Sequence, residues 1–135
     1  MSEPSASNNG PRVLVIEDEM LVRMFAVDAL EDAGFLVTEA ADAGEALSIL
    51  EQDAPQFAAI IVDLGLPDRS GDELAEQIRG IRGDVPILIA SGRSERELKE
   101  RFAADAAVAV LAKPYTSALL LQSLDALGVE AAPID

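Results

Sequence analysis

Five polar residues of the sequence each lie close behind a short apolar run. They provide three carboxylates, one hydroxyl and one ammonium group: Glu17, Asp18, Asp63, Ser91 and Lys113. If the apolar runs are parallel strands, their carboxyl ends meet at one edge of a sheet, and these groups come together there. Neighbouring carboxylates repel one another unless a proton or a cation lies among them, and Mg²⁺ suits a small, open carboxylate cluster. The sequence therefore predicts a Mg²⁺ site at this edge.

A carboxylate whose charge is offset by a metal ion can attack phosphorus and form an acyl phosphate. Asp63 is the best candidate for this nucleophile, because it stands alone behind its apolar run. The Lys113 ammonium would neutralise one phosphoryl oxygen, and the Ser91 hydroxyl would donate a hydrogen bond to another. The pattern therefore indicates phosphoryl transfer to Asp63.

The apolar runs alternate with segments of helical period, which is typical of an α/β fold built around a parallel sheet. Five strands are predicted, at about 13–16, 35–39, 58–62, 86–90 and 107–111. Helices are predicted at about 19–33, 42–52, 72–81 and 94–104, with a last helix after Pro114. Gly34 is expected to end the first helix, Asp42 and Glu45 to cap the second, and Ser94 to begin the fourth.

The length of 135 residues, half of them apolar, fits one domain with a real core. Residues 12–127 are predicted to form this domain. Residues 1–11 consist mainly of Ser, Asn, Pro and Gly, and are predicted to be a disordered leader. Residues 128–135 are predicted to be a short acidic tail.

The composition excludes several classes of function. Ten basic and 25 acidic residues give a net charge of −15, which argues against binding to nucleic acid or to an anionic membrane surface. No apolar stretch approaches the ~20 residues that span a bilayer. The chain has no Cys and no His, so any phosphohistidine must come from a partner. A cytoplasmic protein is predicted.

Taken together, four stretches resemble the receiver domain of two-component response regulators, over about Arg12 to Leu127. They carry the site residues in that family's order and spacing, at 13–19, 60–71, 90–92 and 112–115. The resemblance implies a flavodoxin-like (βα)₅ fold, a doubly wound sheet with strand order 2-1-3-4-5. Because no effector segment is visible, a stand-alone receiver is predicted, signalling through an unknown downstream protein.

The resemblance also implies roles for the site residues. Asp18 and Asp63 would bind Mg²⁺ directly together with the Gly65 carbonyl oxygen, and Glu17 would act through water. Asp63 would accept the phosphoryl group from a sensor histidine kinase or a histidine phosphotransfer protein, and Ser91 and Lys113 would hold it. The Lys113–Pro114 peptide bond would be cis.

The sequence departs from the family at Val110, where many receivers carry an aromatic residue that couples to the phosphorylation site. Gly65 and Arg93 stand at positions that influence the lifetime of the acyl phosphate in the family. A phosphorelay intermediate or phosphate sink remains an alternative function. A Mg²⁺-dependent phosphohydrolase fits less well, because Gly65 stands where such enzymes carry a second Asp. We therefore predict that the chain is not an enzyme beyond its own phosphorylation and dephosphorylation.

The first predicted helix also suggests a docking surface. A helical wheel places its core-facing residues on one stripe: Val22, Phe25, Ala26, Ala29 and Ala33. Met20, Met24 and Val27 fall opposite, beside the acidic cluster. Such adaptable apolar side chains suit docking of a phosphodonor, and the alternative is scattered surface apolarity without a role.

Overall fold

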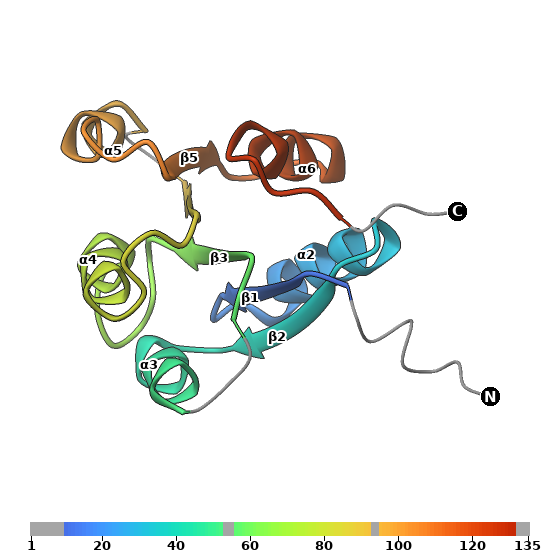
Figure 1. The fold of residues 1–135 in the computed structure, drawn as a ribbon, viewed down its shortest axis with the longest axis horizontal. Coiled ribbons are helices and arrows are strands. Elements are labelled where there is room, and N and C mark those ends of the chain that lie inside the picture. Colours follow the sequence, from blue (N-terminus) through green and yellow to red (C-terminus); the bar gives the residue numbers. More distant parts are fainter. Residues whose placement is uncertain (1–9, 53–55, 93–94, 132–135) are drawn as a thin grey trace.

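A parallel sheet forms the centre of the computed structural model, which describes residues 10–52, 56–92 and 95–131 (Figure 1). Its five strands run in the order β2 (Leu36–Ala40), β1 (Arg12–Ile16), β3 (Ala59–Asp63), β4 (Ile87–Ser91) and β5 (Val108–Ala112). This is the 2-1-3-4-5 order of a flavodoxin-like fold, so the predicted fold class is confirmed.

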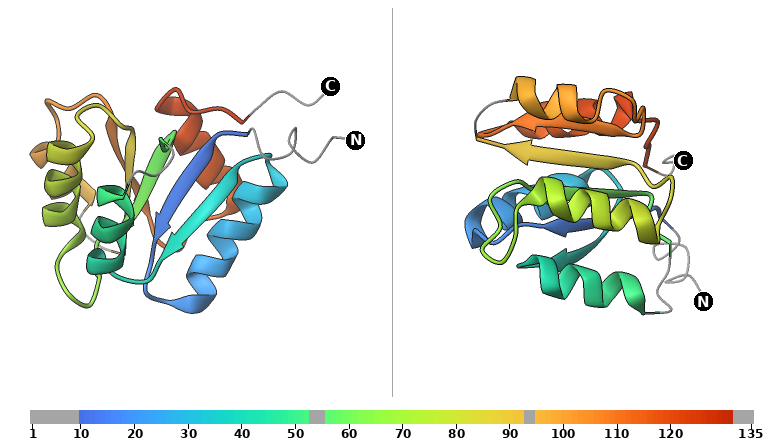
Figure 2. Two further views of the ribbon diagram at one scale, coloured as in Figure 1. Left: turned by 60° about the horizontal axis from the view of Figure 1, so that its bottom comes forward. Right: turned by 90° about the vertical axis from the view of Figure 1, so that its left-hand side faces the viewer.

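Helices cover both faces of the sheet (Figures 1 and 2). On one face lie α3 (Ala43–Glu51), α4 (Gly71–Ile81) and α5 (Glu95–Arg101), and on the other lie α2 (Met20–Asp32) and α6 (Ser117–Ala126). One core includes Leu74 and Leu98, and the second includes Leu30 and Leu124. Because both faces are covered, every residue of the central strands β3 and β4 is buried, which explains their continuous apolar runs.

Local signals set the helix ends. Asp42 caps α3 by accepting a hydrogen bond from the Glu45 amide at 2.7 Å, as predicted. The Glu45 carboxylate reaches back to the Ala41 amide at 2.8 Å, one residue before the cap. Gly34 follows α2 with a φ of 102°, a conformation that favours glycine, as predicted for the end of this helix. The predicted cap at Ser94 lies outside the described residues.

The fourth predicted helix ends earlier than expected. It was predicted to reach about residue 104, but α5 ends at Arg101. The cause lies in Asp105, whose carboxylate accepts hydrogen bonds from the Ala107 amide at 3.0 Å and from Arg79 at 2.9 Å. These bonds stabilise a non-helical turn and so oppose the extension of α5.

Phe25 corrects the predicted core stripe of α2. Its side chain is 43% exposed and packs against Tyr115, with 6.0 Å between ring centroids. Ala26 and Ala29 are buried as expected, whereas Leu30, outside the predicted stripe, is completely buried. Helical periodicity identified an apolar stripe, but it could not determine which edge of that stripe faces the sheet.

The ends of the described chain pack against the domain. The Pro11 carbonyl accepts a hydrogen bond from the Leu36 amide at 2.9 Å. After α6, Gly128 has a φ of 82°, and the chain turns back so that Val129 is buried in the second core. Most of the predicted leader (residues 1–9) and the end of the predicted tail (132–135) lie outside the described residues. None of the described helices combines the length and apolarity that crossing a bilayer requires.

Candidate metal-binding and active site

The register of the sheet brings the predicted site residues to one edge. Asp63, the last residue of β3, pairs with Ala90, directly before Ser91. Ser91 in turn pairs with Ala112, directly before Lys113. Three neighbouring positions along the carboxyl edge therefore carry a carboxylate, a hydroxyl and an ammonium group. Ser91 is buried at the end of β4, and its carbonyl oxygen accepts a hydrogen bond from the Lys113 amide at 2.8 Å.

The carboxylates of Glu17, Asp18 and Asp63 form one cluster, with a ligand atom of each within 4.8 Å of the others. Glu17 and Asp63 are only 4% and 5% exposed, whereas Asp18 is open to solvent. Burial raises the pKa of Glu17 to about 6. Burial and the nearby Asp63 carboxylate also raise the pKa of Asp18. Three carboxylates in one cluster, two of them with a raised pKa, fit a hard divalent cation such as Mg²⁺.

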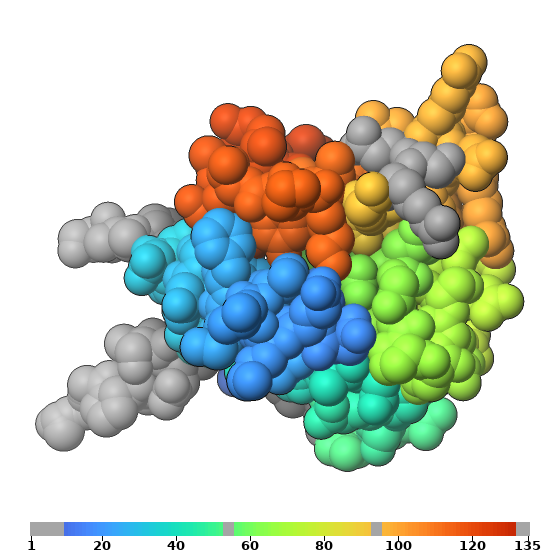
Figure 3. Space-filling view, turned by 180° about the vertical axis from the view of Figure 1, so that it is seen from behind, coloured from blue at the N-terminus to red at the C-terminus, as the bar shows by residue number. Residues whose placement is uncertain are grey.

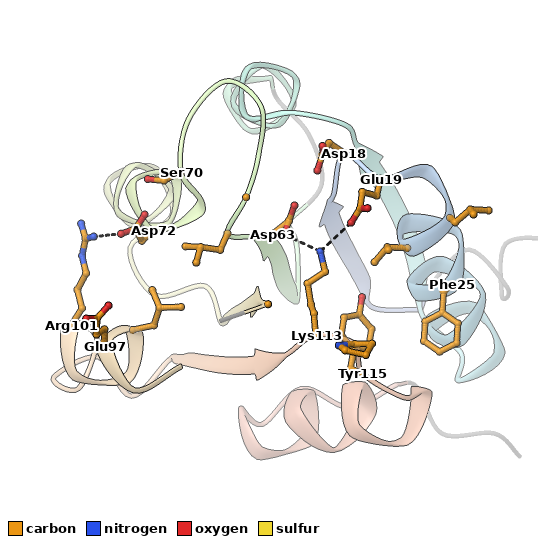
Figure 4. Close-up of a pocket in the computed structure, with 17 residues that line it drawn as sticks. Asp18, Glu19, Phe25, Asp63, Ser70, Asp72, Glu97, Arg101, Lys113 and Tyr115 are labelled. Carbon is orange, nitrogen blue, oxygen red and sulfur yellow. Dashed lines mark hydrogen bonds and ion pairs between the residues drawn. The ribbon is translucent and has the colours of Figure 1, made fainter. Parts of the chain in front are cut away.

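Lys113 supplies the cationic group of the site. Its Nζ lies 3.0 Å from Glu17 Oε1. It also lies 3.1 Å from Asp63 Oδ1 and 3.7 Å from Glu19 Oε1 (Figure 4). Burial alone would lower the pKa of Lys113, but the hydrogen bonds to Glu17 and Asp63 outweigh it and raise the pKa, so the ammonium stays charged at neutral pH. The Lys113–Pro114 peptide bond is cis, as the resemblance implied.

An open cavity of about 1390 Å³ gives access to these groups. It extends from Phe25 and Tyr115 past Asp63 and Lys113 to Arg101 (Figure 4). Gly65, the predicted carbonyl ligand, is exposed in the loop after β3 and lines the same cavity. Figure 3 shows the face on which α2 (blue) lies beside the segment of β5 and α6 (orange to red).

The predicted docking residues are only partly on the surface. Met20 and Met24 are exposed, but Val27 is half-buried. The sequence analysis missed Leu21, which is 79% exposed, and Phe25, both of which line the cavity beside the acidic cluster. The exposed apolar patch of α2 therefore consists of Met20, Leu21, Met24 and Phe25.

Two further residues of the site were missed. Glu19 approaches the Lys113 ammonium, and a third acidic residue directly after Glu17 and Asp18 was a visible signal for it. Arg23 donates a hydrogen bond from Nη1 to the Glu17 carbonyl oxygen at 2.7 Å. Its only signal in the sequence is that it is the sole basic residue of α2.

Comparison with known proteins identifies the family. The family model of the response regulator receiver domain matches residues 13–125. This chain belongs to the response regulator receiver domain family. The transcriptional regulatory protein PdtaR of Mycobacterium tuberculosis is 35% identical to this receiver over 115 residues, which are 84% of this chain and 55% of PdtaR. The receiver thus spans about half the length of that relative.

Solved structures show the same relationship. The chemotaxis protein CheY4 of Vibrio cholerae has a TM-score of 0.78 and 30% identity, covering 87% of this receiver and 98% of CheY4. A response regulator of Burkholderia pseudomallei, solved with a phosphorylated aspartic acid and a calcium ion, has a TM-score of 0.75 and 30% identity. That match covers 88% of this receiver and 70% of the Burkholderia chain.

The raised pKa of Glu17 predicts how stability depends on pH without divalent cations. Between the ordinary value of 4.5 and the folded value of about 6, the folded chain retains a proton that the unfolded chain has lost. The free energy of unfolding should therefore fall by about 2 kcal/mol as pH rises through this window, and stay lower above it. Glu17→Gln should remove this fall, so that the variant is more stable than wild type at pH 7 but not at pH 4. Urea unfolding in EDTA at both pH values measures the difference, and equal pH profiles would contradict the assignment.

Proposed function

We propose that this receiver accepts a phosphoryl group on Asp63 from a phosphohistidine, in a reaction that requires Mg²⁺. One observation carries the proposal: a nearly buried Asp63 lies 3.1 Å from the Lys113 ammonium and within one cluster with Glu17 and Asp18. A carboxylate, a cation and two further acidic ligands are the groups that attack on phosphorus needs.

Each residue has a defined task in this reaction. Asp18, Asp63 and the Gly65 carbonyl oxygen would hold Mg²⁺ directly, Glu17 would act through water, and the ion would neutralise developing phosphoryl charge. An Asp63 oxygen forms the new bond to phosphorus as the phosphorus–nitrogen bond of the donor breaks, and that electron pair leaves with the donor histidine. Lys113 pairs with a phosphoryl oxygen in place of its present carboxylate partners.

Ser91 would complete the binding of the phosphoryl group by donating its hydroxyl hydrogen to a second phosphoryl oxygen. The Burkholderia relative supports the general scheme, since its structure contains both a phosphorylated aspartic acid and a divalent cation. Because residues 1–135 contain no His, the phosphohistidine would lie outside them, on a sensor histidine kinase or a histidine phosphotransfer protein. The receiver would then modify only itself and would not act as an enzyme on other substrates.

The donor is proposed to dock on α2. It would contact the exposed side chains of Met20, Leu21, Met24 and Phe25 and the exposed part of Val27. This patch borders the cavity that leads to Asp63. Farther along the same exposed side of the helix lie three acidic residues that pair with no cation among the described residues: Asp28, Glu31 and Asp32. The expected occupant is a donor helix with apolar side chains and a basic end.

Charge substitution in the patch tests donor docking. Met20→Glu combined with Met24→Glu should reduce phosphotransfer from the cognate donor at least tenfold, which corresponds to ~1.4 kcal/mol of binding free energy. The two carboxylates remove apolar contacts and would have to lose water against the apolar side chains of the donor helix. Labelling by acetyl phosphate, which needs no docking, should be unchanged. Unchanged phosphotransfer from the donor would contradict the docking role, whereas equal loss of both reactions with a lowered melting temperature would indicate misfolding.

The output of the receiver is proposed to be a phosphorylation-dependent interaction with another protein. A net charge of −15 disfavours nucleic acid and membrane surfaces as targets. The cytoplasmic location that this proposal assumes is compatible with the absence of Cys. A phosphorelay intermediate or phosphate sink would instead return or lose the phosphoryl group rapidly, and the lifetime of the acyl phosphate distinguishes these outputs.

Intact mass measurement tests the proposed chemistry directly. Incubation with acetyl phosphate and Mg²⁺ should add one phosphoryl group, and the same incubation with EDTA should add none. Treatment with neutral hydroxylamine should remove the group, because it cleaves acyl phosphates but not phosphoesters. A modification that forms equally in EDTA, or that survives hydroxylamine, would contradict the proposal.

A further inference from the structure

The loop between β1 and α2 carries two of the three clustered carboxylates, so the position of its backbone determines where they lie. It contains only Glu17, Asp18 and Glu19. Glu19, the N-cap of α2, makes no side-chain capping bond, and its amide donates instead to Glu17 Oε2 at 3.1 Å. The Glu17 amide is fixed by the Ala40 carbonyl oxygen at 3.0 Å. The next peptide group, between Glu17 and Asp18, needs another anchor.

Arg23 supplies that anchor from the second turn of α2. Its Nη1 donates to the Glu17 carbonyl oxygen at 2.7 Å, and its Nε donates to Glu39 Oε1 at 3.1 Å. The Arg23 side chain is only 19% exposed, whereas that of Glu39 is 50% exposed. The guanidinium thus links the end of β2, the carbonyl group before Asp18 and the body of α2.

We infer that Arg23 is a positioning residue of the metal site, which holds the Glu17–Asp18 peptide so that both carboxylates face the cation. This inference rests on the proposed Mg²⁺-dependent function. Arg23 touches none of the three carboxylate groups of the cluster in any contact described, so it acts through the backbone. A charge-assisted hydrogen bond to a carbonyl oxygen is strong enough to restrict such a short loop.

Positioning and simple electrostatics predict opposite effects of removing Arg23. A cation next to the cluster repels Mg²⁺, so loss of its charge alone would tighten binding. Loss of the anchor would loosen the loop. Mg²⁺ binding would then be weaker, because part of its free energy would be used to order the loop again. The direction of the change in Mg²⁺ affinity therefore separates the two roles.

Calorimetric titration with MgCl₂ provides the test, with thermal melting of each variant in EDTA. Arg23→Met should weaken Mg²⁺ binding about five- to tenfold, and Arg23→Lys, which keeps the charge and one donor, should weaken it less. Arg96→Met is the matched control, because it removes the same charge from an exposed ion pair with Glu100 on α5 and should leave affinity unchanged. Glu39→Gln keeps the bond to the Glu17 carbonyl oxygen and should have a smaller effect than Arg23→Met.

Acetyl phosphate labelling supplies a second readout. With Arg23→Met, the Mg²⁺ concentration for half-maximal rate should rise, and the rate at saturating Mg²⁺ should return to that of wild type. Unchanged or tighter Mg²⁺ binding would overturn the inference, as would a lowered melting temperature with a rate that saturating Mg²⁺ does not restore. If the wild-type protein binds no Mg²⁺, the proposed function fails and this inference fails with it. If the wild-type protein binds Mg²⁺ but Arg23→Met does not weaken the binding, only the inference about Arg23 fails.

Discussion

Asp63→Asn should abolish labelling by acetyl phosphate at every Mg²⁺ concentration. Asparagine matches the shape of aspartate and still offers an oxygen to the Lys113 ammonium, which lies 3.1 Å from Asp63 Oδ1. Its amide cannot form an acyl phosphate, so the loss would be chemical and not structural. Intact mass after incubation should show only the unmodified chain, and the melting temperature should confirm that the variant is folded.

Asp18→Asn is the matched comparison, because it changes a carboxylate of the same cluster in the same way. It leaves the nucleophile in place and removes one proposed metal ligand. Labelling should therefore survive. The Mg²⁺ concentration that it requires should rise by roughly tenfold or more, which corresponds to ~1.4 kcal/mol of binding free energy for each factor of ten. Labelling that persists in Asp63→Asn and disappears in Asp18→Asn would show that the nucleophile was assigned to the wrong residue.

The central strands and the edge that carries the site could be predicted from the sequence for one physical reason. Strands covered on both faces must be apolar throughout, so β3 and β4 stand out as continuous runs that end in Asp63 and Ser91. Parallel pairing then places the ends of neighbouring strands side by side, whatever the details of the helices. The position of Lys113 follows from the same argument, because its strand β5 pairs with β4.

Features that depend on one edge of a helix or on a distant partner could not be predicted. Phe25 lies at the margin of the α2 stripe, and its exposure depends on Tyr115, 90 residues later in the chain. Arg101 on α5 forms ion pairs with Asp72 and Glu76 on α4, which join the two helices. No local pattern distinguishes such an arginine from a solvated one.

Arg23 illustrates the same limit within the site. Its partners lie six and sixteen residues away, on the loop before α2 and at the end of β2. Helical periodicity places Arg23 only on a face of α2, and the pairing of β1 with β2 is what brings Glu39 within its reach. The half-buried side chain of Val110 packs against the first core.

Lys113→Met should destabilise the metal-free protein and make its stability depend on Mg²⁺. The substitution removes the only cation that the described contacts place between Glu17 and Asp63, whose side chains are 5% and 7% exposed. Nearly buried carboxylates without a partner lower the free energy of unfolding, but proton uptake by Glu17 and access of water limit this decrease. We expect the free energy of unfolding at pH 7 in EDTA to fall by about 2 to 3 kcal/mol. Mg²⁺ should recover most of this loss, since it can replace the ammonium as counter-charge.

The same substitution should slow labelling by acetyl phosphate about 100-fold even at saturating Mg²⁺, because the transferred group loses the cation that neutralises one of its oxygens. Lys99→Met on the exposed side of α5 removes an equal charge and should change neither stability nor rate. Urea unfolding with and without Mg²⁺, together with labelling rates, measures both effects. If Lys113→Met matched Lys99→Met in EDTA, the ammonium would contribute nothing to holding the carboxylates together. A normal labelling rate would mean that stabilisation of the phosphoryl group comes from Mg²⁺ and Ser91 without Lys113.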